Sequence, residues 1–180
     1  MASYQGIHYV DAAGIISKVP VYVQAVLFSP HAMTDVLDLN FWDEANAVAD
    51  SHTFFTATPS SGVITDDDTG HDVMTAAAFP ATDVVKVIAG SGSTTYHTYH
   101  LIDTAGDNDH FHITPTTTWG DETSKTYEVI VYPSRPFFNA TCTGITNDFT
   151  TQWYYMGGIY VPNLICETCT SGGTALIYTR

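Results

Sequence analysis

The stretch from Trp153 to Thr179 constrains the fold of this chain more than any other. Short runs of aromatic and β-branched residues there are separated by Gly157-Gly158, Pro162-Asn163 and Ser171-Gly172-Gly173. Runs closed by glycine, proline or asparagine are typical of consecutive antiparallel strands. We therefore expect the glycine pairs to form turns. We also expect the last run, Thr174–Thr179, to be a strand held in a sheet.

The composition points away from helix. The 180 residues include 27 Thr but only 6 Leu, and 15 Asp against 4 Glu. Threonine fits a pleated surface, aspartate prefers turns and caps, and the long helix-forming residues are scarce. We predict one all-β domain over residues 1–180, an antiparallel β-sandwich of jelly-roll-like type with at most one or two short helical turns.

About ten strand-like runs are separated by turn residues, which is the rhythm of a sandwich or barrel. Thr34–Trp42 alternates, with Leu37, Leu39 and Phe41 expected on one face of a half-buried strand. Asp43–Asp50 is the stretch that suits a helical turn, and Pro133–Pro136 is expected to break the chain. The other main runs are Gly6–Val10, Lys18–Phe28, Phe54–Ala57, Asp83–Gly90, Thr94–Asp103, Phe111–Thr114 and Lys125–Tyr132.

The net charge is −14, from 19 acidic and 5 basic residues. A chain with so few cations cannot neutralise a run of phosphates, so neither nucleic acid nor an anionic membrane is expected as a partner. No apolar run approaches the ~20 residues of a membrane helix, and the first residues lack the pattern of a secretory signal. We expect synthesis in a cytoplasm, without export by that route.

Four histidines surround a polar loop at Thr104–Asp109. His97 and His100 precede the loop, while His110 and His112 follow it and would share one face of a strand. If the two runs paired, one of the first pair could face the second, and gathered imidazoles can bind zinc, copper or iron. The His-x-His also resembles the cupin metal site, but the acidic residue that cupins place shortly afterwards is missing. Polar strand residues on a solvent or subunit face are the favoured interpretation.

The cysteines offer a second test. Cys166 and Cys169 form a Cys-x-x-Cys, and Cys142 is the only other cysteine. Three thiolates and one imidazole could hold zinc, and a redox pair would need a helix N-terminus, which the predicted strands do not supply. Partly buried thiols are the favoured interpretation.

No other motif carries chemistry. Asp66-Asp67-Asp68 offers oxygen ligands for calcium without the spacing of an EF-hand, and a solvated loop is favoured there. The chain has no nucleophile elbow and no phosphate-binding glycine loop. We assign no catalytic, cofactor-binding or metal-binding residue and do not expect an enzyme.

The large aromatic residues exceed what one small core can bury on one face. Such residues are favoured at protein–protein contacts, and a platform for sugars is the competing interpretation. Core packing remains the ordinary fate of any single one. The set comprises Tyr22, Trp42, Trp119, Trp153, Tyr154, Tyr155 and Tyr160.

Three stretches resemble a group of small tailed-phage structural proteins. They are Lys18–Val26 followed by Asp35–Leu39, Thr126–Tyr132 before a Pro-Phe segment, and Gly158–Pro162 with Ser171–Tyr178 as a closing hairpin. The resemblance implies a non-enzymatic virion protein made in the host cytoplasm, a capsid decoration or minor structural protein. It also implies a homo-oligomer that contacts other virion proteins such as the major capsid protein. The alternatives are a carbohydrate- or receptor-binding module of a viral fibre and a metal-dependent β-barrel enzyme.

Overall fold

The computed structural model describes residues 6–50, 55–58, 63–66, 74–75, 77–90, 99–108, 110–114, 122–125, 127–142 and 150–180. Within these ranges the chain is built from antiparallel strands, and the all-β prediction is confirmed. The helical element in this part of the chain is one 3-10 turn, Glu44–Asn46, which is capped by the carboxylate of Asp43 accepting from the Ala45 amide. No helix among the described residues is long and apolar enough to cross a membrane.

The chain divides into two compact units. Unit 1 comprises residues 1–42 and 135–180, and unit 2 comprises residues 43–134. Unit 2 is therefore an insertion between two strands of unit 1. The prediction of a single domain over residues 1–180 stays a prediction, because two compact units can still unfold as one.

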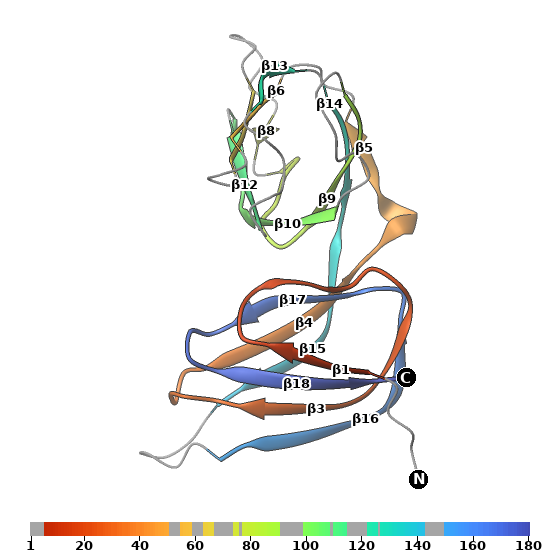
Figure 1. The fold of residues 1–180 in the computed structure, drawn as a ribbon, viewed down its shortest axis with the longest axis vertical. Helices are drawn as coiled ribbons and strands as arrows, with labels where there is room; N and C mark the ends of the chain where they lie inside the picture. Colours follow the sequence, from red (N-terminus) through yellow and green to blue (C-terminus); the bar gives the residue numbers. More distant parts are fainter. Residues whose placement is uncertain are drawn as a thin grey trace. The chain divides into compact units, whose positions relative to one another are not determined.

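Unit 1 contains two sheets of four strands, which form two layers (Figure 1). Sheet A has the order β1 (Gly6–Val10), β18 (Thr174–Thr179), β3 (Val21–Ser29) and β16 (Gln152–Val161). Sheet B has the order β15 (Ser134–Thr141), β4 (Val36–Trp42), β17 (Leu164–Cys169) and β2 (Gly14–Ser17).

One apolar core lies between these sheets. Alternate residues of each strand point into it, as the two-residue period of a strand requires. Sheet A contributes Val10, Val23, Val26, Phe28, Val161, Ala175 and Ile177, while Leu37, Leu39, Leu164 and Cys166 come from sheet B. Residues from both sheets share one cluster, so unit 1 is a β-sandwich, as predicted for the chain.

The closing strands β16, β17 and β18 exist as predicted, but they do not form hairpins with one another. The Pro162-Asn163 connection takes the chain from sheet A to sheet B, and residues 170–173 return it to sheet A. The Asn163 side chain fixes the first crossing, because its Oδ1 accepts from the Trp42 amide at 2.7 Å and its Nδ2 donates to the Trp42 carbonyl at 3.1 Å. The last strand is held between β1 and β3, as expected of a strand locked into a sheet.

The prediction of a turn at Gly157-Gly158 is wrong. β16 continues through both residues against the same partner, β3, with a register shift between Tyr155 and Ile159. Both glycines have positive φ, +67° and +85°. Glycine reaches this region without a Cβ penalty, so the pair forms a bulge in a long strand rather than its end.

Three other expectations need correction. The strand is not broken at Pro136, which lies inside β15. This proline is tolerated because β15 is an edge strand, where a missing N–H costs no hydrogen bond within the sheet. The short edge strand β2 was not anticipated, and the strand expected from Lys18 begins only at Val21. In β4, Leu37 and Leu39 face the core as predicted, but Trp42 is buried too, so the strand is not half-buried along its length.

Unit 2 is an eight-stranded antiparallel sheet that curls around its own core (Figure 1). Its core contains Ile64, Phe79, Val85, Ile102, Phe111, Ile113, Val129 and Val131. The strand order is β13 (Glu122–Lys125), β6 (Phe55–Thr58), β7 (Val63–Asp66), β12 (His110–Thr114), β10 (Tyr99–Thr104), β9 (Val84–Gly90), β14 (Tyr127–Tyr132) and β5 (Val48–Asp50); β8 (Met74–Thr75) pairs separately with β11 (Asp107–Asn108).

The two ends of the insertion meet at the base of unit 2. The Asp43 amide donates to the Pro133 carbonyl at 2.9 Å, and β4 and β15 are neighbours in sheet B. An Asn-Gly turn in place of residues 44–132 can therefore join them as a hairpin. We expect this variant to fold, since the core between sheets A and B includes no residue of the deleted segment. Circular dichroism and thermal unfolding measure the outcome.

A truncation before β18 is the matched control, because it removes Ala175 and Ile177 from the core and should prevent folding. If the insertion-deleted variant showed no cooperative unfolding, the two units would be one folding domain.

Candidate functional site: the outer face of sheet A

The strands of sheet A carry large apolar residues on the side away from the core. In β1, Ile7 and Tyr9 are 60% and 63% exposed, while Val10 is buried. In β16, Trp153 and Tyr155 are 47% and 79% exposed, although the neighbouring Tyr154 packs against the core. The core cluster of unit 1 uses the inner side of sheet A, and these outward residues are not part of it.

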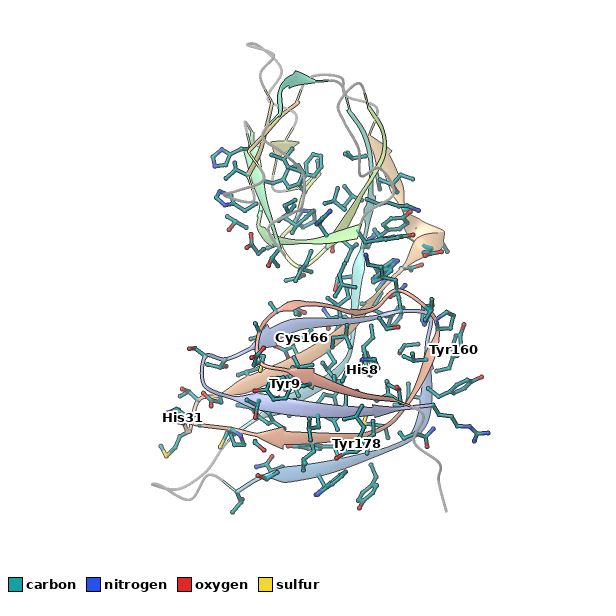
Figure 2. All side chains as sticks on the ribbon, viewed as in Figure 1. His8, Tyr9, His31, Tyr160, Cys166 and Tyr178 are labelled. Atoms are coloured by element: carbon teal, nitrogen blue, oxygen red, sulfur yellow. The ribbon has the colours of Figure 1, made fainter. Side chains whose placement is uncertain are left out.

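The strand register assembles these residues into two rows across the sheet. In the first row Tyr9 is opposite Leu176, Leu176 is opposite Leu27, and Leu27 is opposite Trp153. The second row runs Ile7, Tyr178, Ala25, Tyr155. Every member is apolar or a tyrosine and none is charged. We call these two rows the outer face, and Figure 2 labels Tyr9 and Tyr178 within it.

Aromatic contacts hold one edge of the outer face in place. The Trp153 ring stacks on Tyr178, with centroids 5.2 Å apart, and on Tyr155 at 5.9 Å. Stacked rings lose little further side-chain freedom when a partner covers them, which favours a preformed contact surface.

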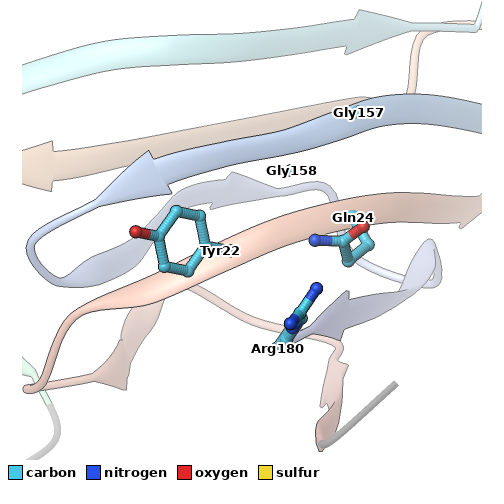
Figure 3. A pocket seen from close by; sticks show the side chains of 5 residues that line it. All are labelled: Tyr22, Gln24, Gly157, Gly158 and Arg180. Carbon is cyan, nitrogen blue, oxygen red and sulfur yellow. The ribbon is translucent and has the colours of Figure 1, made fainter. Parts of the chain in front are cut away.

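A pocket of about 450 Å³ opens next to the second row (Figure 3). It is lined by Tyr22, Gln24, Gly157, Gly158 and Arg180. Tyr22 also meets Tyr160 edge to face, with centroids 5.3 Å apart. The bulge shapes the pocket wall, because a Cβ on Gly158 would lie 2.9 Å from Nε2 of Gln24, whereas one on Gly157 would meet open space.

The predicted aromatic set divides between core and surface. Tyr22, Trp153, Tyr155 and Tyr160 are exposed as the contact hypothesis requires, while Trp42 is fully buried. Trp119 lies outside the described residues. Sequence reasoning missed Ile7, Tyr9, Leu27, Leu176 and Tyr178, although the alternation of β1 and β18 carried the signal.

The histidines do not converge. β10 and β12 do pair, but the residue opposite His112 is Thr104, and His100 is buried opposite Val85 on β9. His110 and His112 share a face as predicted, with ring centroids 5.3 Å apart. His97 lies outside the described residues. In the part of the chain that the structure describes, no three His, Cys, Asp or Glu side chains are grouped as metal ligands.

The three cysteines are free thiols on or beside sheet B. Cys142 and Cys166 are buried and Cys169 is partly buried, in line with the interpretation favoured from the sequence. Burial raises the pKa of Cys166 to about 12, with smaller contributions from Cys169, Asp38 and Glu167. Burial also raises the pKa of Cys169. Burial therefore favours the protonated thiol at both positions, and a thiol attacks disulfides more slowly than a thiolate does.

The triple aspartate can be placed only in part. Asp66 is the last residue of β7, and Asp67 and Asp68 lie outside the described residues.

In unit 2, the Lys86 amino group donates to the Tyr99 hydroxyl at 3.0 Å and lies over its ring, and this hydrogen bond raises the pKa of Lys86.

Comparisons with family models, with curated proteins and with solved structures find no significant match to this chain. Function is therefore inferred from the fold and from the outer face of sheet A.

The buried position of Cys166 predicts that thiol reagents modify it slowly in the native protein. At about pH 8 a thiol with a pKa of about 12 is almost entirely protonated. We expect Cys166 to react with an aromatic disulfide reagent at least about tenfold more slowly in the native protein than after unfolding, because its thiolate is scarce and its side chain is fully buried. Because the folded state binds the proton more tightly, Cys166 favours folding below about pH 9 and this contribution is lost as the pH rises toward 12.

The matched control is Cys166→Ala, which should remove one reactive group after unfolding and none from the fast native phase. Rapid native modification of Cys166 would show that this part of the sandwich opens readily.

Proposed function

We propose that this protein is a non-enzymatic virion structural protein, a capsid decoration or minor structural protein that works through protein–protein contacts. The strand order of unit 1 is the observation that carries the proposal. The eight strands of unit 1 can be lettered B to I in chain order, so that β1 to β4 are B to E and β15 to β18 are F to I. Sheet A then has the order B-I-D-G and sheet B the order F-E-H-C. This order supports a jelly roll, in which a long antiparallel hairpin is rolled into two sheets.

Jelly rolls serve in viral capsids, in lectins and in cupins. A cupin-type enzyme is disfavoured because His110 and His112 belong to β12 of unit 2, outside the sandwich. The space between the sheets of unit 1 is filled by apolar side chains such as Phe28, Leu37 and Ile177. A sandwich filled in this way suits a rigid body that presents a surface.

The outer face of sheet A supports adhesion as the work of this surface. Exposed aromatic residues gathered in one place are typical of protein contacts, while a monomer needs no such surface. The partners we propose are other copies of the chain and virion proteins such as the major capsid protein. The place of action is the virion, after synthesis in the host cytoplasm.

Banding of virus particles tests the proposal. Particles of the virus that encodes the chain are purified through successive density gradients, and the chain is quantified by mass spectrometry. We expect a constant ratio to the major capsid protein through every gradient, because a structural component does not wash away. An abundant soluble host protein serves as the control for carry-over. Recovery of the chain only in the soluble fraction would contradict the proposal.

Carbohydrate binding is a second candidate, favoured by the pocket beside the outer face. Gln24 offers donors and an acceptor, Arg180 offers donors, and Tyr22 with Tyr160 provides aromatic surface, a combination that suits sugar hydroxyls and an apolar ring face. The net charge of −14 favours a neutral over an acidic sugar.

This candidate predicts that a neutral trisaccharide of glucose or N-acetylglucosamine binds the purified protein, as measured by saturation-transfer NMR. Gly157→Asn should abolish binding, because asparagine tolerates positive φ and its side chain would enter the pocket. Tyr9→Ser, in β1, is the control and should bind normally. Failure of all neutral sugars would remove the candidate.

A further inference from the structure

We propose that the outer face of sheet A is the interface of a two-fold symmetric dimer of this chain. The inference rests on the proposed function and deepens it by naming the first partner, a second copy. The self-complementary surface consists of the rows Tyr9, Leu176, Leu27, Trp153 and Ile7, Tyr178, Ala25, Tyr155.

Charge selects a second copy over a basic partner. Recognition of a basic surface would place carboxylates across from it, and neither row of the outer face contains one. The whole chain carries −14, so most approaches of two copies bring acidic groups together. The outer face is a surface on which two copies meet without opposing charges, because all its members are apolar or tyrosine.

The area is close to what a stable dimer needs. With about 200 Å² for a whole aromatic side chain, the exposed parts of the two rows amount to roughly 500 Å². Tyr22 and Tyr160, which are 49% and 53% exposed beside the second row, raise this to roughly 700 Å², and this extension reaches Arg180, which lines the pocket with Tyr22 outside the two uncharged rows. A standard interface takes about 800 Å² from each partner.

In the proposed dimer, the A sheets of the two copies pack face to face. Sheet A already packs one face against sheet B, and its other face carries apolar and tyrosine side chains in rows across the strands. Two such faces related by a two-fold axis form an isologous contact that closes at two copies. The dimer would thus be two sandwiches stacked through their A sheets, and no further copy can add to the same surface.

Sedimentation equilibrium of the purified full chain tests the dimer. We expect a mass that rises from one copy to two between low and high micromolar concentration and then stays constant. Ile7→Asp should raise the dissociation constant at least about tenfold, because it buries an unpaired charge. Val19→Asp is the matched control: Val19 is 63% exposed against 60% for Ile7, but it lies between β2 and β3, outside the rows.

Tyr155→Ser provides a second variant that adds no charge, and we expect it also to weaken the dimer at least about tenfold. Both positions are exposed, so each variant should keep the thermal unfolding midpoint measured for the monomer. A monomer at all concentrations would overturn the inference, as would a dimer weakened equally by Val19→Asp and Ile7→Asp.

The measurement separates this inference from the virion assignment, because it uses purified protein without particles. A monomer that still bands with particles would overturn the dimer and leave the assignment standing. A dimer broken by Ile7→Asp, in a chain that never bands with particles, would support the dimer and overturn the assignment.

Discussion

The packing of sheet A against sheet B is the interaction on which the rest of unit 1 depends. It requires one apolar face from each strand, and Phe28, Leu39 and Ile177 meet that requirement from three different strands. A strand shows its two faces at alternate residues, so burying one face fixes what the other presents to its surroundings. The exposed Tyr9 and Tyr155 are therefore consequences of a core built by their neighbours, and their apolar character needs a separate cause. Packing between the two sheets does not require it, and the cause that we propose is a partner.

A bulge in β16 allows both of its ends to place apolar residues in the core. If β16 alternated regularly throughout, Tyr160 would face the core and Val161 would face outward. The bulge at Gly157-Gly158 shifts the register and reverses the faces of the residues that follow. Val161 consequently returns to the core while Tyr160 stays outside. The same bulge forms one wall of the pocket next to the outer face, so it affects both the core and the surface of unit 1.

Much of the fold could be predicted from local sequence. The runs that became β1, β4, β14 and β18 alternate strongly and end at turn residues, which is why their positions were recognisable. The pairing of strands was not accessible in this way. Pro162-Asn163 looks like a hairpin turn, yet it crosses between sheets because the Asn163 amide bonds the backbone of Trp42, more than a hundred residues away. Long-range partners of this kind leave no local signal.

The sequence by itself determined that this protein is built from strands and that its net charge is −14. Only the tertiary structure decided which aromatic residues are outside. In β16 both alternating sets are apolar, Trp153 and Tyr155 in one and Tyr154 and Met156 in the other. Alternation separates the two sets but does not orient them. The strand is oriented by the sheet across the core, which contacts Tyr154 and Met156 and leaves Trp153 and Tyr155 for another surface.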